Sequence, residues 1–192
     1  MKRLLFILGV FPLIVSCVTD GKTGSNASSC DSDTIVAEQS DVLRSVIGSV
    51  GEGTTMHELE LLADNDSVSP ASNQPQYFSY DNDAIGGVAA GDRVVVSWFG
   101  TNKEDVIITN LTSLSHLWTL DNTDGSQAIQ LDDDFNATVY GMDEAFEHWT
   151  VNHGTLELSC GDRTVTYDIQ LLTEDSLILA NDSETLKLTK RN

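Results

Sequence analysis

The sequence predicts an all-β protein built from two successive antiparallel units. Apolar and polar residues alternate through many short runs, which is the two-residue period of a half-buried strand. Turn-forming residues (Gly, Asn, Asp and Ser) separate these runs at short intervals. The runs follow one another so closely that little of the chain after residue 42 is left for helix.

The first unit is expected to hold five strands between residues 35 and 113. The first two flank Gly51-Glu52-Gly53 and form a hairpin, because a short Gly-containing turn joins antiparallel strands. Gly91-Asp92 is a tight turn before the strongest strand signal of the chain, and Ala84-Ile85 with the following glycines is expected to form one helical turn or a bulge. Strands at this spacing predict a small closed or partly closed barrel of the OB or SH3 type. The expected strands are residues 42–50, 56–62, 76–80, 93–100 and 105–111.

The second unit is expected to hold eight strands between residues 114 and 192. Turn formers such as Asn122-Thr123-Asp124-Gly125 and Asn181-Asp182-Ser183 separate them. Short strands joined by short turns predict an up-and-down meander that closes into a barrel, since closure removes exposed strand edges. The expected strands are residues 116–120, 128–131, 137–140, 148–151, 155–160, 165–169, 177–179 and 185–188. The side chains expected to face inward are Trp118, Leu120, Ile129, Leu131, Trp149, Val151, Leu156, Leu158, Val165, Tyr167, Ile169, Leu177, Leu179, Leu186 and Leu188.

Residues 1–16 have the layout of a secretory signal peptide. Lys2 and Arg3 precede an apolar run, and the small residue Ser16 ends it. This run is shorter than the roughly 20 apolar residues of a membrane-spanning helix, and Pro12 interrupts it. We therefore expect a cleaved leader and no spanning anchor.

Ile14-Val15-Ser16-Cys17 resembles the lipobox of bacterial lipoproteins. That resemblance implies diacylation of the Cys17 thiol, cleavage before it and acylation of the new N-terminus with a fatty acid such as palmitate. Several acyl chains hold a protein stably to a membrane. Residues 17–34 are then a lipidated cysteine and a flexible polar tether. Val18 is not an acidic retention residue, so by the same resemblance we expect an outer-membrane lipoprotein of the cell envelope, on the periplasmic or the surface-exposed side.

The formal net charge of −20 limits the classes of partner. Nucleic acids and anionic lipid headgroups bind clustered Lys and Arg, which this chain lacks outside its C-terminus. We therefore expect no nucleic-acid partner. The acidity acts chiefly as a solubility device, and divalent cations or basic partners are the classes that it favours.

Three cysteines are present. With Cys17 lipidated, Cys30 and Cys160 remain for a disulfide that an oxidising compartment would preserve. Two unpaired thiols, with Cys160 as a small core hydrophobe, agree equally well with the sequence.

The second unit resembles the lipocalin-like lipoproteins of Gram-negative bacteria over residues 114–191. The order of Trp118, Asp124-Gly125, Trp149 and Tyr167-Asp168-Ile169, followed by Lys190-Arg191, carries the resemblance. The first unit is similar to the small barrel often fused in front of such domains. The resemblance implies a barrel either filled by its own side chains or holding one small ligand.

No stretch matches a catalytic, phosphate-binding or complete calcium-binding pattern, so we expect no enzyme and no cofactor. The histidines are scattered, and Asp132-Asp133-Asp134 is interpreted as a turn rather than a metal site. The expected function is a binding module for a small apolar or amphipathic ligand; the alternative is a structural scaffold with filled barrels. The candidate contacts with a ligand or partner are Tyr77, Phe78, Tyr80, Trp118 and Trp149.

Overall fold

The computed structural model describes residues 42–64, 74–81, 83–101, 103, 105–121 and 124–191, which lie in one compact unit, Glu38–Asn192. The expected signal peptide, lipidated Cys17, tether and Cys30 lie outside the described residues. The structure confirms the predicted all-β fold class, with one five-stranded and one eight-stranded antiparallel sheet. The division into two domains at residues 113/114 stays a prediction.

The five-stranded sheet has the order β3-β2-β1-β4-β5. The two longest strands, β1 and β4, pair at its centre from Leu43↔Phe99 to Ser49↔Arg93. Among the described residues no ladder joins β3 to β5, so the sheet is open between these edges. The strands are β1 (Leu43–Val50), β2 (Glu58–Ala63), β3 (Gln76–Ser79), β4 (Arg93–Phe99) and β5 (Ile107–Asn110).

Strand β4 carries apolar residues on both of its faces because both faces are buried over most of its length. Val94, Val96 and Trp98 pack in the core of the five-stranded sheet. Val95 points to the opposite side and packs with the core of the eight-stranded sheet. A strand covered on both sides has a continuous apolar run instead of alternation, which accounts for the strength of its sequence signal.

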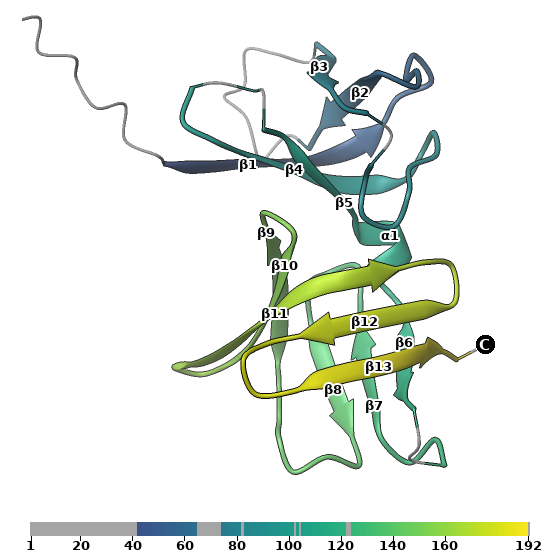
Figure 1. Ribbon diagram of the computed structural model, residues 1–192, viewed down its shortest axis with the longest axis vertical. Helices are drawn as coiled ribbons and strands as arrows, with labels where there is room; N and C mark the ends of the chain where they lie inside the picture. The colour runs from purple at the N-terminus through teal and green to yellow at the C-terminus, as the bar shows by residue number, and fades with distance from the viewer. Residues whose placement is uncertain are drawn as a thin grey trace, which may run out of the picture. The chain divides into compact units, whose positions relative to one another are not determined.

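The eight-stranded sheet is a meander in which consecutive strands pair, except for β8 and β9, which are the two ends of the strand order (Figure 1). The last strand of the unit, β13, pairs with its first strand, β6, through Trp118↔Lys190 and two further residue pairs. The first and last strands along the chain therefore lie side by side in the middle of the strand order. All eight predicted strands are confirmed within one or a few residues. They are β6 (Leu117–Leu120), β7 (Ala128–Leu131), β8 (Ala137–Tyr140), β9 (His148–Asn152), β10 (Thr155–Cys160), β11 (Arg163–Leu172), β12 (Ser176–Ala180) and β13 (Thr185–Lys190).

The two edge strands, β8 and β9, meet and nearly close the sheet into a barrel. Ala137 N donates to Glu147 O at 2.9 Å, and Trp149 N donates to Phe135 O at 2.9 Å. An isolated bridge joins Asn136 to His148 in the same place. We call this short join between β8 and β9 the barrel seam.

The one helix in the described part of the chain, α1 (Leu111–Leu114), was not predicted. Asn110 caps it by accepting a hydrogen bond from Ser113 N. Leu114 is fully buried, and its carbonyl accepts the indole N–H of Trp118 at 2.8 Å. Of the two alternatives predicted for Ala84-Ile85 and the following glycines, the helical turn does not form, because Ile85 makes an isolated bridge with Thr109; the bulge stays a prediction.

Candidate functional site

Large side chains fill the middle of the eight-stranded barrel. Trp118 and Leu158 are completely shielded from solvent, and Leu177 and Leu179 are 1% exposed. Of the residues predicted to face inward, Leu120, Val165 and Leu186 are only partly buried although they pack against the same core. The central barrel is therefore a packed core, and space for another molecule lies toward one end.

A pocket of about 250 Å³ opens at the barrel end where β6 leads into β7, β8 into β9 and β12 into β13. We call it the mouth pocket. Its wall combines strand residues with residues of the 141–147 loop between β8 and β9. It is lined by Leu120, Gln127, Ile129, Met142, Asp143, Glu144, Phe146, Tyr167, Glu184 and Leu186.

The inner wall of the mouth pocket is apolar because it continues the barrel core. Ile129 is 3% exposed and Phe146 is 7% exposed, and both belong to the core cluster. Leu120, Met142 and Leu186 are partly buried against that cluster. Small-molecule sites usually combine such an apolar wall with polar groups that orient the ligand, and here the remaining lining residues carry the polar groups.

Tyr167 and Glu184 form the best-defined polar contact of the pocket. The Tyr167 hydroxyl donates to Glu184 Oε1 at 2.8 Å. Burial of the tyrosine raises its pKa well above 10, and the hydrogen bond to the Glu184 carboxylate raises it further. Tyr167 therefore keeps its proton and acts as a fixed donor to Glu184 over the whole physiological range.

The other two carboxylates of the pocket differ in their surroundings. Glu144 pairs with Arg163, the first residue of β11, and the side chains of both are about half exposed. Asp143 is exposed and has no hydrogen bond or ion pair among the described residues. The pocket thus has three carboxylates on its wall and one neighbouring guanidinium.

The structure places the predicted contact residues away from the mouth pocket. Trp118 lies in the barrel core, and Trp149 is 2% exposed with its indole N–H on Asp132 O at 3.0 Å. Phe78 packs on Trp98 in the other sheet, with ring centroids 5.5 Å apart. Tyr77 is 52% exposed, and its hydroxyl donates to Glu60 Oε1. Their role as ligand or partner contacts stays a prediction, and Tyr77 is the most accessible of these four.

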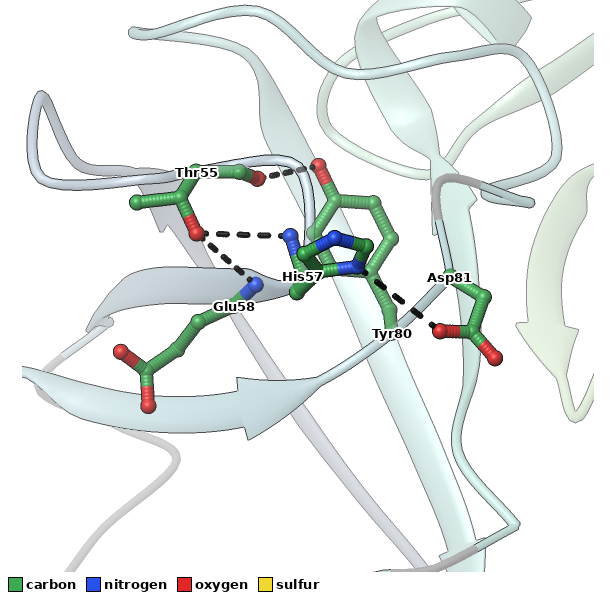
Figure 2. A network of polar contacts seen from close by, with 5 residues as sticks. All are labelled: Thr55, His57, Glu58, Tyr80 and Asp81. Carbon is green, nitrogen blue, oxygen red and sulfur yellow. Dashed lines mark hydrogen bonds and ion pairs between the residues drawn. The ribbon is translucent and has the colours of Figure 1, made fainter.

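Tyr80 borders a second, shallower pocket of about 320 Å³, beside the β1–β2 turn. Its hydroxyl donates to the carbonyl of Thr55 at 3.1 Å, and the Thr55 hydroxyl accepts the backbone N–H groups of His57 and Glu58 (Figure 2). These bonds fix the turn before β2.

The nearby His57 ring points toward Asp81, with Nδ1 4.0 Å from Oδ1 (Figure 2). Their side chains are 79% and 96% exposed, so water screens the pair and it contributes little to stability. The Glu58 side chain points away from both residues (Figure 2).

Within the part of the chain that the structure describes, no group of three or more His, Cys, Asp or Glu residues is placed to hold a metal ion. Cys160 is a free, partly buried thiol there, and its expected partner Cys30 falls outside the described residues. Across these same described ranges, no helix is long and apolar enough to cross a membrane.

Sequence reasoning missed most of the mouth pocket. Four lining residues, Leu120, Ile129, Tyr167 and Leu186, were predicted to face inward, but the loop residues Met142 and Phe146 were not considered. One signal was available, since Phe146 is a large aromatic residue in the acidic segment Asp143-Glu144-Ala145-Phe146-Glu147, which shows no strand alternation. Such a residue in a loop commonly packs back onto a core.

Comparison with known proteins gives a limited result. No family model and no curated protein matches the chain. Among solved structures, the chain is similar to a lipocalin-like protein from Bacteroides thetaiotaomicron VPI-5482, with 25% sequence identity and a TM-score of 0.35. The match covers 41% of this chain and 97% of that chain. The fold described above rests on the strand ladders of this chain itself.

Proposed function

We propose that this protein is a non-catalytic binding module that takes a small apolar or amphipathic ligand into the mouth pocket. The observation that carries the proposal is a pocket of about 250 Å³ whose apolar inner wall continues the barrel core and whose other lining residues carry polar or charged groups. An engineered cavity of about 150 Å³ admits benzene, so the space suits a ligand of modest size. We further propose that the module belongs to the cell envelope, held to the outer membrane through lipidated Cys17.

A non-catalytic role is supported by the chemistry of the pocket wall. Tyr167 is fixed as a donor to Glu184, and Glu144 is paired with Arg163. None of the pocket residues is a cysteine, serine or histidine that would serve as an activated nucleophile or as its base. The wall offers apolar contact and hydrogen-bond acceptors, which suit the positioning of a ligand.

A structural scaffold is the second candidate, and the filled centre of the barrel favours it. Trp118, Leu158, Leu177 and Leu179 leave the middle of the barrel packed. A scaffold would need no ligand in the mouth pocket.

Native mass spectrometry of the full-length protein, purified from cells without refolding, separates the two functions. A binding module is expected to carry a stoichiometric small-molecule adduct that is lost on denaturation. In Leu186→Trp, the larger side chain would occupy the space of the pocket, so this variant is expected to carry no adduct. The matched control is Leu171→Trp, since Leu171 is 41% exposed and does not line the pocket.

A mass without adduct in repeated preparations would count against the binding module and favour the scaffold. An adduct that survives Leu186→Trp would place the ligand elsewhere, and the pocket beside Tyr80 would then be tested next.

A further inference from the structure

We infer that the ligand of the mouth pocket carries a positively charged, hydrogen-bond-donating head, such as a primary ammonium group, on an apolar body. This inference rests on the proposed function and names the chemical class of its ligand. It follows from the combination of an apolar inner wall with carboxylates at the rim, since neither feature alone selects this class.

The first step is the state of the rim carboxylates. Glu184 receives the Tyr167 hydroxyl on Oε1, while Oε2 has no partner among the described residues. Asp143 likewise has none, and only Glu144 has a cation, Arg163. Two of the three carboxylates on the pocket wall are therefore not neutralised by the protein itself. A cationic head placed there would gain charge-assisted hydrogen bonds, whereas an anionic head would be repelled.

The surroundings of the pocket strengthen the same preference. The turns at this end of the barrel add Asp124, Asp162 and Asp182, and these acidic residues outnumber the cation Arg163, which begins β11 directly after Asp162. The field at the opening is thus negative beyond the pocket wall. Such a field raises the local concentration of cationic ligands and disfavours fatty acids and other anions.

The second step is the choice between an organic cation and a metal ion. Calcium takes six to eight oxygen ligands, and magnesium requires octahedral coordination. Among the described residues, no group of three or more Asp, Glu, His or Cys side chains is placed so that it could hold a metal ion. The inner wall includes Leu120, Ile129 and Phe146, whose side chains have no ligand atom for a metal ion. The same side chains can bury the apolar body of an amphipathic amine. The pocket therefore fits an ammonium group at the rim with hydrocarbon beneath it.

The test uses three probes that share one apolar body and differ in the head: hexylammonium, 1-hexanol and hexanoate. A buried six-carbon chain gives an affinity on the order of millimolar, which is within reach of an NMR titration of the full-length protein. At pH 7 an alkyl amine is charged, because its pKa is near that of lysine. We expect hexylammonium to bind about tenfold more tightly than 1-hexanol, and hexanoate to bind more weakly than both. The preference should shrink in 0.5 M salt.

Two double variants with the same change in net charge show whether the pocket itself selects the head. Asp143→Asn with Glu184→Gln neutralises the two wall carboxylates that have no cation beside them and is expected to bring hexylammonium and 1-hexanol within about twofold of each other. Asp162→Asn with Asp182→Asn removes two charges from neighbouring turns that do not line the pocket, and should keep most of the preference. Thermal melting of each variant checks that it is folded.

The outcomes separate this inference from the proposed function. Equal binding of hexylammonium and 1-hexanol to the wild type overturns the cationic head but leaves the binding module standing. A preference that both double variants reduce equally would come from net charge alone and would also overturn the inference. Binding of none of the three probes would overturn the proposed function together with it.

Discussion

Replacing Tyr167 by Phe removes one hydroxyl from the barrel while keeping the ring in place. The ring is 2% exposed, and the hydroxyl lies 2.8 Å from Glu184 Oε1. A hydrogen bond to a charged group contributes about 1.5–3 kcal/mol, but Glu184 is exposed and water can replace the lost donor. We therefore expect Tyr167→Phe to lower the free energy of unfolding at pH 7 by about 1 kcal/mol.

The pH dependence gives a sharper signature than the loss at pH 7. Burial, followed by the hydrogen bond to Glu184, raises the pKa of folded Tyr167 above the value of 10 for an ordinary tyrosine. Above pH 10 the unfolded chain releases this proton while the folded chain retains it, so the stabilisation present below pH 10 is lost as the pH rises. The contribution to the slope is at most about 1.4 kcal/mol per pH unit. Tyr167→Phe lacks this contribution.

Urea unfolding followed by tryptophan fluorescence at pH 7, 9, 10 and 11 measures both effects. The wild type should lose stability above pH 10 more steeply than Tyr167→Phe. Tyr140→Phe is the matched control, because Tyr140 is 50% exposed and should leave the wild-type slope unchanged. Equal slopes for the wild type and Tyr167→Phe would refute the assignment of a raised tyrosine pKa at this position.

Two further substitutions test the core and the loop that borders the pocket. Trp118→Ala, at a side chain with no solvent exposure, should lower the free energy of unfolding by about 3–5 kcal/mol in urea titrations, and a loss below 1 kcal/mol would contradict a packed barrel centre. Gly141 and Gly87 share a φ of 66°, but a Cβ at Gly141 would lie 2.1 Å from Ser126 O, whereas one at Gly87 would have no atom within 4 Å. Gly141→Ala should therefore cost about 1–3 kcal/mol more than Gly87→Ala in thermal unfolding, and equal costs would show that the loop yields without penalty.

The sequence predicted the strands well because alternation follows directly from burial of one face. It also identified β4, where Val94, Val95 and Val96 are all buried. It did not predict α1, which has four residues and depends on the Asn110 cap and on packing beneath Trp118. A segment of that length has no helical period to detect.

The mouth pocket was harder to predict, for a geometric reason. Alternation shows that Leu120 and Leu186 face inward, but it does not show how far along the barrel axis each one lies. Both are near strand ends and are only partly buried. Phe146 and Met142 reach the pocket from a loop, where no period applies. The position of the pocket therefore depends on how the loops pack over the end of the barrel. This packing is tertiary structure, which the alternation of apolar and polar residues does not reveal.

The barrel seam has a consequence for the motions of the protein. Seven neighbouring strand pairs are joined by ladders, whereas β8 and β9 are held by an isolated bridge and two backbone hydrogen bonds. Local opening follows the segments with the fewest bonds to break. The amide protons of Ala137 and Trp149 should thus exchange with solvent before those in the centre of β12, and parting of the seam would bring water to one side of a core that otherwise stays dry.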